Sequence, residues 1–289
     1  MRNRWKTGVG LVGAVAAALL AVQVVPLPSA HAADCADAEV VFARGTTEDP
    51  GPGPNGQAFI DALRSRVSPK SIATYAVDYP ATTDFPTAVI GISDARAHIL
   101  ATAASCPQTK MVLGGFSQGA AVMGFVTADV VPEGISPLDV PAPMPAEVAD
   151  HVAAVVLFGK PSPRFMRAIS DPQITIGQLY TAKTIDLCVD NDLVCDPHGS
   201  SFAVHTRYDD VGMIDQGSSF AANQLQIAWA ADAAAAAAVA GAPPPDAPAA
   251  HLPATGTAGP VGPVESAAAP SEHLPSAESP MLGPAVPVT

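Results

Sequence analysis

The 289 residues carry 14 Lys and Arg against 27 Asp and Glu, which gives a formal net charge of −13 at pH 7. An acidic excess of this size repels nucleic acid and anionic lipid surfaces, so we exclude nucleic-acid binding. Beyond the N-terminal apolar run, no segment of the sequence is long and apolar enough to cross a bilayer, so no transmembrane anchor is expected there.

Residues 1–32 have the pattern of a secretory signal peptide. Three basic residues among the first six precede an apolar run from Val9 to Val25, and Ala30-His31-Ala32 is a small-x-small cleavage site. A membrane anchor is the alternative, but the glycines within the run and the cleavage site disfavour it. We therefore expect a secreted chain that begins near Ala33.

Five short apolar stretches are predicted strands, and helical patterns separate them. The strands are expected at 39–43, 72–79, 110–114, 152–158 and 183–188, and the helices at about 57–67, 86–105 and after Ser117. Near-continuously apolar strands that alternate with helices indicate a parallel sheet covered on both faces. We expect a three-layer α/β fold with a five-stranded parallel sheet of order 2-1-3-4-5, in one domain over residues 33–240.

Two stretches depart from this pattern. Residues 131–145 contain five prolines, too many for a helix or a strand, and are expected to form an ordered excursion. Residues 241–289 are rich in alanine and proline, contain no lysine, arginine or aromatic residue, and are expected to be a disordered tail. A sortase-like stretch, Leu252-Pro253-Ala254-Thr255-Gly256, is interpreted as accidental because no apolar span and basic end follow it.

The four cysteines are expected to form two disulfides, because their number is even and the chain is predicted to be exported. Zinc binding is the alternative, but no Cys-x-x-Cys pair is present. Cys35 and Cys106 each lie just before a strand, and these two strands are neighbours in the expected sheet order, so their pairing is geometrically natural. Cys188 and Cys195 would then close a ring of eight residues.

The stretch Gly115-Phe116-Ser117-Gln118-Gly119 carries the first chemical signal. An apolar strand precedes it and a helical pattern follows it, which predicts a sharp strand-to-helix turn with Ser117 at its apex. Such a turn lifts a serine hydroxyl clear of the backbone, where a neighbouring base can activate it as a nucleophile. An ordinary glycine-rich turn is the alternative.

A serine nucleophile needs a histidine base and a carboxylate that orients it, in the chain order serine, acid, histidine on folds of this kind. Downstream of Ser117, only residues 187–208 are dense in both. The candidate acids are Asp190, Asp192 and Asp196, and the candidate bases are His198 and His205. Spacing alone does not choose among these five.

The chain resembles the cutinase family of secreted serine esterases, which have an α/β-hydrolase-type sandwich. The resemblance rests on the stretch 43–48 (ARGTTE), the Ser117 pentapeptide, the ring from Cys188 to Cys195 with Asp192 inside it, and His205 ten residues beyond that ring. It extends from Cys35 to about Trp229. The excursion 131–145 and the tail are not part of the family's minimal domain, which leaves the substrate preference open.

The resemblance implies a role for each matching residue. Ser117 would be the nucleophile, Asp192 the acid and His205 the base, and the two disulfides would pair as above. The backbone amides of Thr46 and Gln118 would bind the oxyanion, with the Thr46 hydroxyl assisting. No metal and no organic cofactor is implied. An apolar rim for an acyl chain is a further hypothesis, for the residues Leu193, Val194, Phe202, Ala203 and Val204.

These expectations describe a secreted, cutinase-like esterase that hydrolyses fatty-acyl esters, is a monomer, and is associated with the cell surface if its tail attaches there. Two alternatives within the enzymes are an acetylxylan esterase and a phospholipase on the same scaffold. A third alternative is a catalytically inactive secreted binding module.

Overall fold

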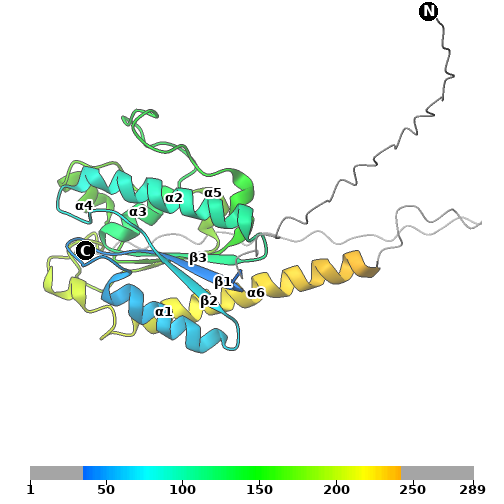
Figure 1. Ribbon diagram of the computed structural model, residues 1–289. Coiled ribbons are helices and arrows are strands. Elements are labelled where there is room, and N and C mark those ends of the chain that lie inside the picture. The colour runs from blue at the N-terminus through cyan, green and yellow to red at the C-terminus, as the bar shows by residue number, and fades with distance from the viewer. Residues whose placement is uncertain (1–34, 242–289) are drawn as a thin grey trace, which may run out of the picture. The chain divides into compact units, whose positions relative to one another are not determined.

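The computed structural model describes residues 35–241, which form a three-layer α/β fold (Figure 1). The five strands are all parallel and lie in the order β2-β1-β3-β4-β5, as predicted. Their bounds are β1 Ala38–Ala43, β2 Ile72–Ala76, β3 Lys110–Phe116, β4 Val152–Phe158 and β5 Thr184–Leu187. The predicted signal peptide and the predicted tail lie outside the described residues.

The described residues contain six α-helices. They are α1 Gly53–Val67, α2 Ala88–Ser105, α3 Gln118–Val126, α4 Pro163–Ala168, α5 Gln178–Thr181 and α6 Met213–Gly241. Figure 1 shows α1 and α6 on one face and α2 and α3 on the other. Short 3-10 turns lie at Phe85–Thr87, Ala146–His151 and Ala203–Thr206. Among the described residues, no helix combines the length and apolarity that a bilayer span requires.

The sheet separates two apolar cores because successive strand residues point to opposite faces. Phe42 and Phe158 pack with Phe59 on the side of α1 and α6. Leu113 and Leu157 pack on the side of α2 and α3. All five side chains are completely buried, which is why the strands read as continuous apolar runs rather than as alternating ones.

The second strand is shorter than predicted. The sequence indicated a strand over 72–79, but regular pairing ends at Ala76. Beyond this point Tyr79 leaves the sheet, and its hydroxyl donates a hydrogen bond to the carbonyl oxygen of Arg44 at 2.5 Å. Burial of Tyr79 against α2, close to Gly91, explains the apolar pattern that resembled a longer strand.

The C-terminal helix α6 was not predicted. Its first half is held by burial, with Ile214, Ser218, Ala221 and Leu225 on one face at helical spacing. Its last turns are exposed and run through the alanines 233–238, residues whose intrinsic helix propensity is high. Composition alone had identified this stretch only as the end of the domain.

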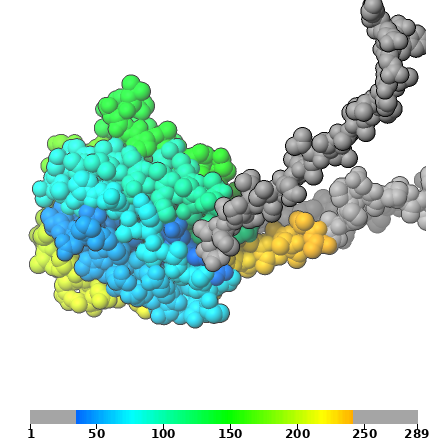
Figure 2. Space-filling model, viewed as in Figure 1, coloured from blue at the N-terminus to red at the C-terminus, as the bar shows by residue number. Residues whose placement is uncertain are grey.

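The excursion 131–145 contains turns but neither helix nor strand, as expected. It leaves the C-terminal end of α3 and returns to the start of β4 through the 3-10 turn Ala146–His151. Figures 1 and 2 show it in green, rising beyond α2 on that face of the molecule.

Both predicted disulfides are present. The first joins Cys35 to Cys106, just before β1 and β3, two strands that pair directly. The second joins Cys188 to Cys195 at the carboxyl end of β5. Each of the four cysteines is therefore in a disulfide, so none has a free thiolate to bind zinc.

Candidate active site

Ser117 lies at the turn between β3 and α3, in a backbone conformation that residues with a side chain rarely adopt. Its φ is 55° and its ψ is −117°, which costs about 1–3 kcal/mol. The flanking glycines make the turn possible: a Cβ on Gly115 would lie 2.2 Å from the carbonyl oxygen of Gly119, and a Cβ on Gly119 would lie 2.0 Å from that of Ala43. The predicted strand, turn and helix are confirmed.

His205 connects Ser117 to Asp192 through its two ring nitrogens. Nε2 lies 2.8 Å from the Ser117 hydroxyl oxygen, and Nδ1 lies 2.7 Å from a carboxylate oxygen of Asp192. The carboxylate holds the proton on Nδ1, so Nε2 is left with its lone pair toward the hydroxyl. The three side chains chosen by the resemblance therefore lie in one hydrogen-bonded chain.

Asp192 is completely buried, and three donors hold its carboxylate. Besides His205, the Tyr208 hydroxyl donates to one oxygen at 2.8 Å and the Val194 amide donates to the other at 2.8 Å. Burial raises the pKa of Asp192, but the hydrogen bonds from His205, Val194 and Tyr208 outweigh it, and the pKa is lowered. The carboxylate is therefore ionised at neutral pH.

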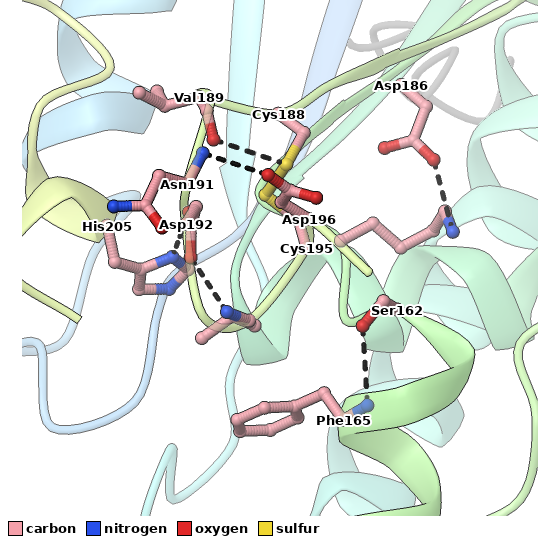
Figure 3. Close-up of a disulfide and its surroundings, with 12 residues drawn as sticks. Ser162, Phe165, Asp186, Cys188, Val189, Asn191, Asp192, Cys195, Asp196 and His205 are labelled. Carbon is pink, nitrogen blue, oxygen red and sulfur yellow. Dashed lines mark hydrogen bonds and ion pairs between the residues drawn. A yellow bond between two sulfur atoms is a disulfide. The ribbon is translucent and has the colours of Figure 1, made fainter. Parts of the chain in front are cut away.

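The disulfide ring determines where Asp192 points (Figure 3). Within the ring, Asn191 has a left-handed φ of 66°. The carboxylate of Asp196, just outside the ring, accepts the Asn191 amide at 2.9 Å. The Cys188–Cys195 bond thus joins the two ends of the loop that carries Asp192, and Asp196 holds the middle of the loop at Asn191. The ring fixes local geometry at the site.

Loss of the Cys188–Cys195 bond is expected to lower activity more than stability. Closing eight residues contributes about 2.5 kcal/mol by loop entropy, against about 4.4 kcal/mol for the Cys35–Cys106 loop. The double variant Cys188→Ser/Cys195→Ser should lose at least tenfold in kcat, because the Asp192 loop is released. The matched control, Cys35→Ser/Cys106→Ser, should melt lower but retain its kcat at 25 °C. Melting curves and butyrate hydrolysis of both variants test this, and equal losses of kcat would contradict it.

The other candidate acids and bases lie elsewhere. Asp190 and His198 are exposed, and Asp196 accepts backbone amides only. His98, a histidine of α2 upstream of Ser117, lies within hydrogen-bond distance of Glu39 in β1. The choice of Asp192 over Asp190, which spacing could not make, follows from burial next to His205.

Thr46 and Gln118, whose backbone amides are the expected oxyanion donors, both line the cavity in front of Ser117. Among the described residues, neither amide donates to a protein acceptor. Gln118 is held in place by its side-chain amide, which donates to the carbonyl oxygen of Thr82 at 3.1 Å. N–H groups without a protein acceptor, on residues that line the same cavity as the Ser117 hydroxyl, are suited to bind an oxyanion.

Two charged residues, the buried Arg44 and the partly buried Glu48, hold the loop that carries Thr46, and the sequence analysis did not single them out. The Arg44 guanidinium donates to the carbonyl oxygens of Glu48 at 2.8 Å and of Tyr79 at 2.5 Å. A carboxylate oxygen of Glu48 accepts the Gly45 amide at 2.6 Å. Burial raises the pKa of Glu48, against the lowering effects of the Gly45 amide and of Arg44. The Arg44–Glu48 spacing within the ARGTTE stretch was the signal available in the sequence.

Tyr208 is the other residue that the sequence analysis missed. It is completely buried, donates to Asp192, and its hydroxyl oxygen lies 3.1 Å from Sγ of Cys195. Burial and the neighbouring Asp192 carboxylate raise its pKa, so it remains a neutral donor. Its position three residues after His205 matches no sequence pattern that would indicate a contact with Asp192. The contact with the Asp192 loop forms only on folding.

Ser117 and His205 open on a cavity of about 910 Å³. Of the residues suggested as an apolar rim, Val194 and Phe202 line this cavity. Val204 instead packs against the core on the side of α1 and α6. The rim hypothesis is therefore correct for only part of that set.

The family profile described as Cutinase matches residues 34–225. This chain belongs to the cutinase family. The match covers the elbow, the disulfide ring and His205, and it supports the earlier resemblance. The family and the carboxylesterase names of the curated relatives identify the chain as a carboxylic ester hydrolase.

Curated relatives from Mycobacterium tuberculosis strain H37Rv are similar over most of their own length. The "Probable carboxylesterase Culp5" is 60% identical over 174 residues, 60% of this chain and 99% of the relative. The "Carboxylesterase Culp1" is 45% identical over 225 residues, 76% of this chain and 97% of the relative. The "Phospholipase Culp4" is 43% identical over 231 residues, 77% of this chain and 96% of the relative.

Two solved structures share the fold. A Trichoderma reesei cutinase in complex with a phosphonate inhibitor aligns with a TM-score of 0.51 at 26% identity, over 66% of this chain and 77% of that chain. An acetylxylan esterase aligns with a TM-score of 0.55 at 22% identity, over 66% of this chain and 100% of that chain. The second likeness concerns the fold alone.

Proposed function

We propose that this cutinase-family esterase hydrolyses fatty-acyl esters through an acyl-enzyme intermediate on Ser117, with His205 as base and Asp192 as the acid that orients it. The observation that carries the proposal is the continuous chain of hydrogen bonds from the Ser117 hydroxyl through His205 to the buried Asp192. The strained elbow supports it, because backbone strain is characteristic of functional sites.

In the proposed first half-reaction, the Ser117 oxygen attacks the ester carbonyl carbon while its proton passes to Nε2 of His205. The tetrahedral intermediate collapses, Nε2 returns the proton to the leaving alcohol, and an acyl-serine ester remains. In the second half-reaction, water gives a proton to Nε2 and attacks the acyl carbon. The bond from this carbon to the Ser117 oxygen then breaks, Nε2 returns the proton to that oxygen, and the fatty acid leaves. Asp192 stabilises the imidazolium in both steps. None of these steps requires a metal or an organic cofactor.

The proposed oxyanion donors are the amides of Thr46 and Gln118, with the Thr46 hydroxyl assisting. They are suited to this role because both border the cavity and have no protein acceptor among the described residues. One such donor is worth on the order of 3 kcal/mol in the transition state. The contacts of Arg44 and Glu48 to the loop before Thr46 would hold the donors in place before substrate arrives.

Labelling with a fluorophosphonate tests the proposal directly, because this reagent reacts with activated serines. We expect one adduct per chain, located on Ser117 by peptide mass spectrometry, and a matching loss of ester hydrolysis. An adduct elsewhere, or an unlabelled protein that still hydrolyses esters, would remove Ser117 from the mechanism. If the chain is instead an inactive binding module, we expect neither a fluorophosphonate adduct nor ester hydrolysis.

Phospholipase activity is the second candidate, and one relative, Culp4, is named for it. The apolar cavity beside Ser117 suits an acyl chain and gives no reason to prefer the acetyl groups of xylan. Rates on a nitrophenyl ester, a diacyl phospholipid and acetylated xylan, measured at one enzyme concentration, distinguish these three activities.

We further propose a secreted monomer whose mature chain begins near Ala33, whose catalytic domain ends near residue 240, and which binds no nucleic acid. The two disulfides support an oxidising compartment, and the net charge of −13 supports the absence of nucleic-acid binding. N-terminal sequencing of the protein recovered from culture medium tests the cleavage site. A protein that keeps residues 1–32 and stays with the cells would contradict secretion.

A further inference from the structure

The cavity at Ser117 is larger than ester hydrolysis alone requires. Its volume of about 910 Å³ is near the upper end for ligand pockets, about 300–1,000 Å³. A short acyl group beside Ser117 would leave most of this space unfilled. The direction in which the cavity extends therefore indicates which part of a substrate occupies it.

The floor of the cavity is one stripe of α3 that begins at the nucleophile. Ala121 and Phe125 follow Ser117 by four and eight residues, so they lie on the same side of the helix, and both line the cavity. At 1.5 Å per residue, the stripe extends about 12 Å from Ser117. The floor is apolar along this whole distance.

One wall is a stripe of α2 that points the same way. Val89, Ile92 and Arg96 recur at helical spacing and line the cavity. The Gln118 side chain donates to the carbonyl oxygen of Thr82, which lies in the segment that leads into α2, so the wall starts from the side of the proposed oxyanion donors. Arg96 therefore marks the end of the wall that is remote from Ser117.

The excursion forms a further wall. It follows α3 after residues 127–130, and its apolar residues Val131, Ile135 and Val140 line the cavity and are partly buried. Leu138, in the same segment, does not line the cavity and is 95% exposed. The excursion, green in Figures 1 and 2, thus has an inner apolar side and an outer side.

We propose that the excursion, together with α2 and α3, forms a channel for the acyl chain, so that the preferred substrates are esters of long-chain fatty acids. The inference rests on the proposed reaction at Ser117 and adds the substrate class and the role of residues 131–145. The occupant is an acyl chain because the channel begins at Ser117, to which the acyl group becomes bonded. Each methylene that the channel removes from water contributes about a fourfold gain in binding.

The test compares Ile135→Asp with Leu138→Asp, the same substitution on the inner and outer sides of one segment. The readout is the ratio of kcat/KM for nitrophenyl laurate to that for nitrophenyl butyrate. For Ile135→Asp we expect this ratio to fall at least tenfold, because the long chain would have to pass a carboxylate. For Leu138→Asp we expect the same ratio as for the unmodified protein. Ile92→Glu, on the opposite wall, should act like Ile135→Asp, and melting temperatures of all three variants verify folding.

Three outcomes overturn the proposal while leaving the proposed catalysis intact. In the first, the ratio is unchanged in both Ile135→Asp and Ile92→Glu. In the second, Leu138→Asp lowers it as much as Ile135→Asp does. In the third, Ile135→Asp changes the relative kcat/KM values for butyrate esters of different alcohols but not those for acyl chains of different length, which would place the alcohol in the channel. Failure of the proposed function itself differs from all three, because the unmodified protein would then show no labelling of Ser117.

Discussion

Replacement of Ser117 by alanine is expected to lower kcat for nitrophenyl butyrate by about 10⁴-fold or more while the fold remains intact. The hydroxyl oxygen is the atom that would bond to the acyl carbon, and only the free amides and binding would remain to assist water. Because alanine keeps the Cβ, the elbow at φ 55° stays strained, and stability should change little. Hydrolysis rates and circular dichroism of the purified variant provide the measurement.

The matched variant Ser117→Gly distinguishes loss of chemistry from loss of structure. Glycine adopts this backbone conformation without steric cost, so relief of about 1–3 kcal/mol of strain should exceed the roughly 0.5–1 kcal/mol that its added chain freedom costs. We expect Ser117→Gly to be as inactive as Ser117→Ala but to melt a few degrees higher. Retained turnover in either variant would remove Ser117 as the nucleophile.

Replacement of Asp192 by asparagine is the second large effect, with an expected fall in kcat on the order of 10⁴-fold. Asparagine fits the same space, but its amide nitrogen cannot accept the proton on Nδ1 of His205, so the imidazole is no longer held in the reactive tautomer. The control is Asp196→Asn, which changes the acid next to the ring that bonds to backbone amides only. This control should stay within about tenfold of the unmodified enzyme. A similar loss in both variants would assign the effect to the loop rather than to His205.

The lowered pKa of Asp192 predicts that the folding stability of the protein decreases at acidic pH. A carboxylate whose folded pKa is depressed contributes stability above its ordinary pKa of 3.8, and this contribution is lost as pH falls through the folded value. Tyr208→Phe removes one donor to Asp192, so the folded pKa should rise towards 3.8, the stability that Asp192 contributes should be smaller, and its loss should be complete at a higher pH. Melting temperatures of both proteins between pH 6 and pH 3 measure this. Parallel curves would show that the Tyr208 bond does not affect Asp192.

Local patterns were enough to predict the layers and the nucleophile. The strands read as apolar runs because both faces of a parallel sheet are buried, and this explains why four of the five predicted strands lie within two residues of the observed ones. Ser117 was recognised because the elbow needs a strand before it, a helix after it and glycines at close approaches, all within ten residues. The Cys35–Cys106 disulfide followed from the order of the strands that begin just after these cysteines, and this pairing left Cys188 and Cys195 to form the second disulfide.

Residues of the chain that meet only after folding could not be assigned in this way. Asp190, Asp192 and Asp196 are aspartates of one loop, and the sequence does not distinguish their roles. Only in the folded protein is Asp192 seen to be the one buried next to His205. Tyr208, Arg44 and Glu48 act through contacts that no periodicity encodes. The excursion read as a proline-rich interruption, and only its position over α3 shows which of its side chains line the cavity. Neighbours along the chain determine strands, helices and turns, whereas hydrogen-bond partners and cavities depend on distances that the completed packing sets.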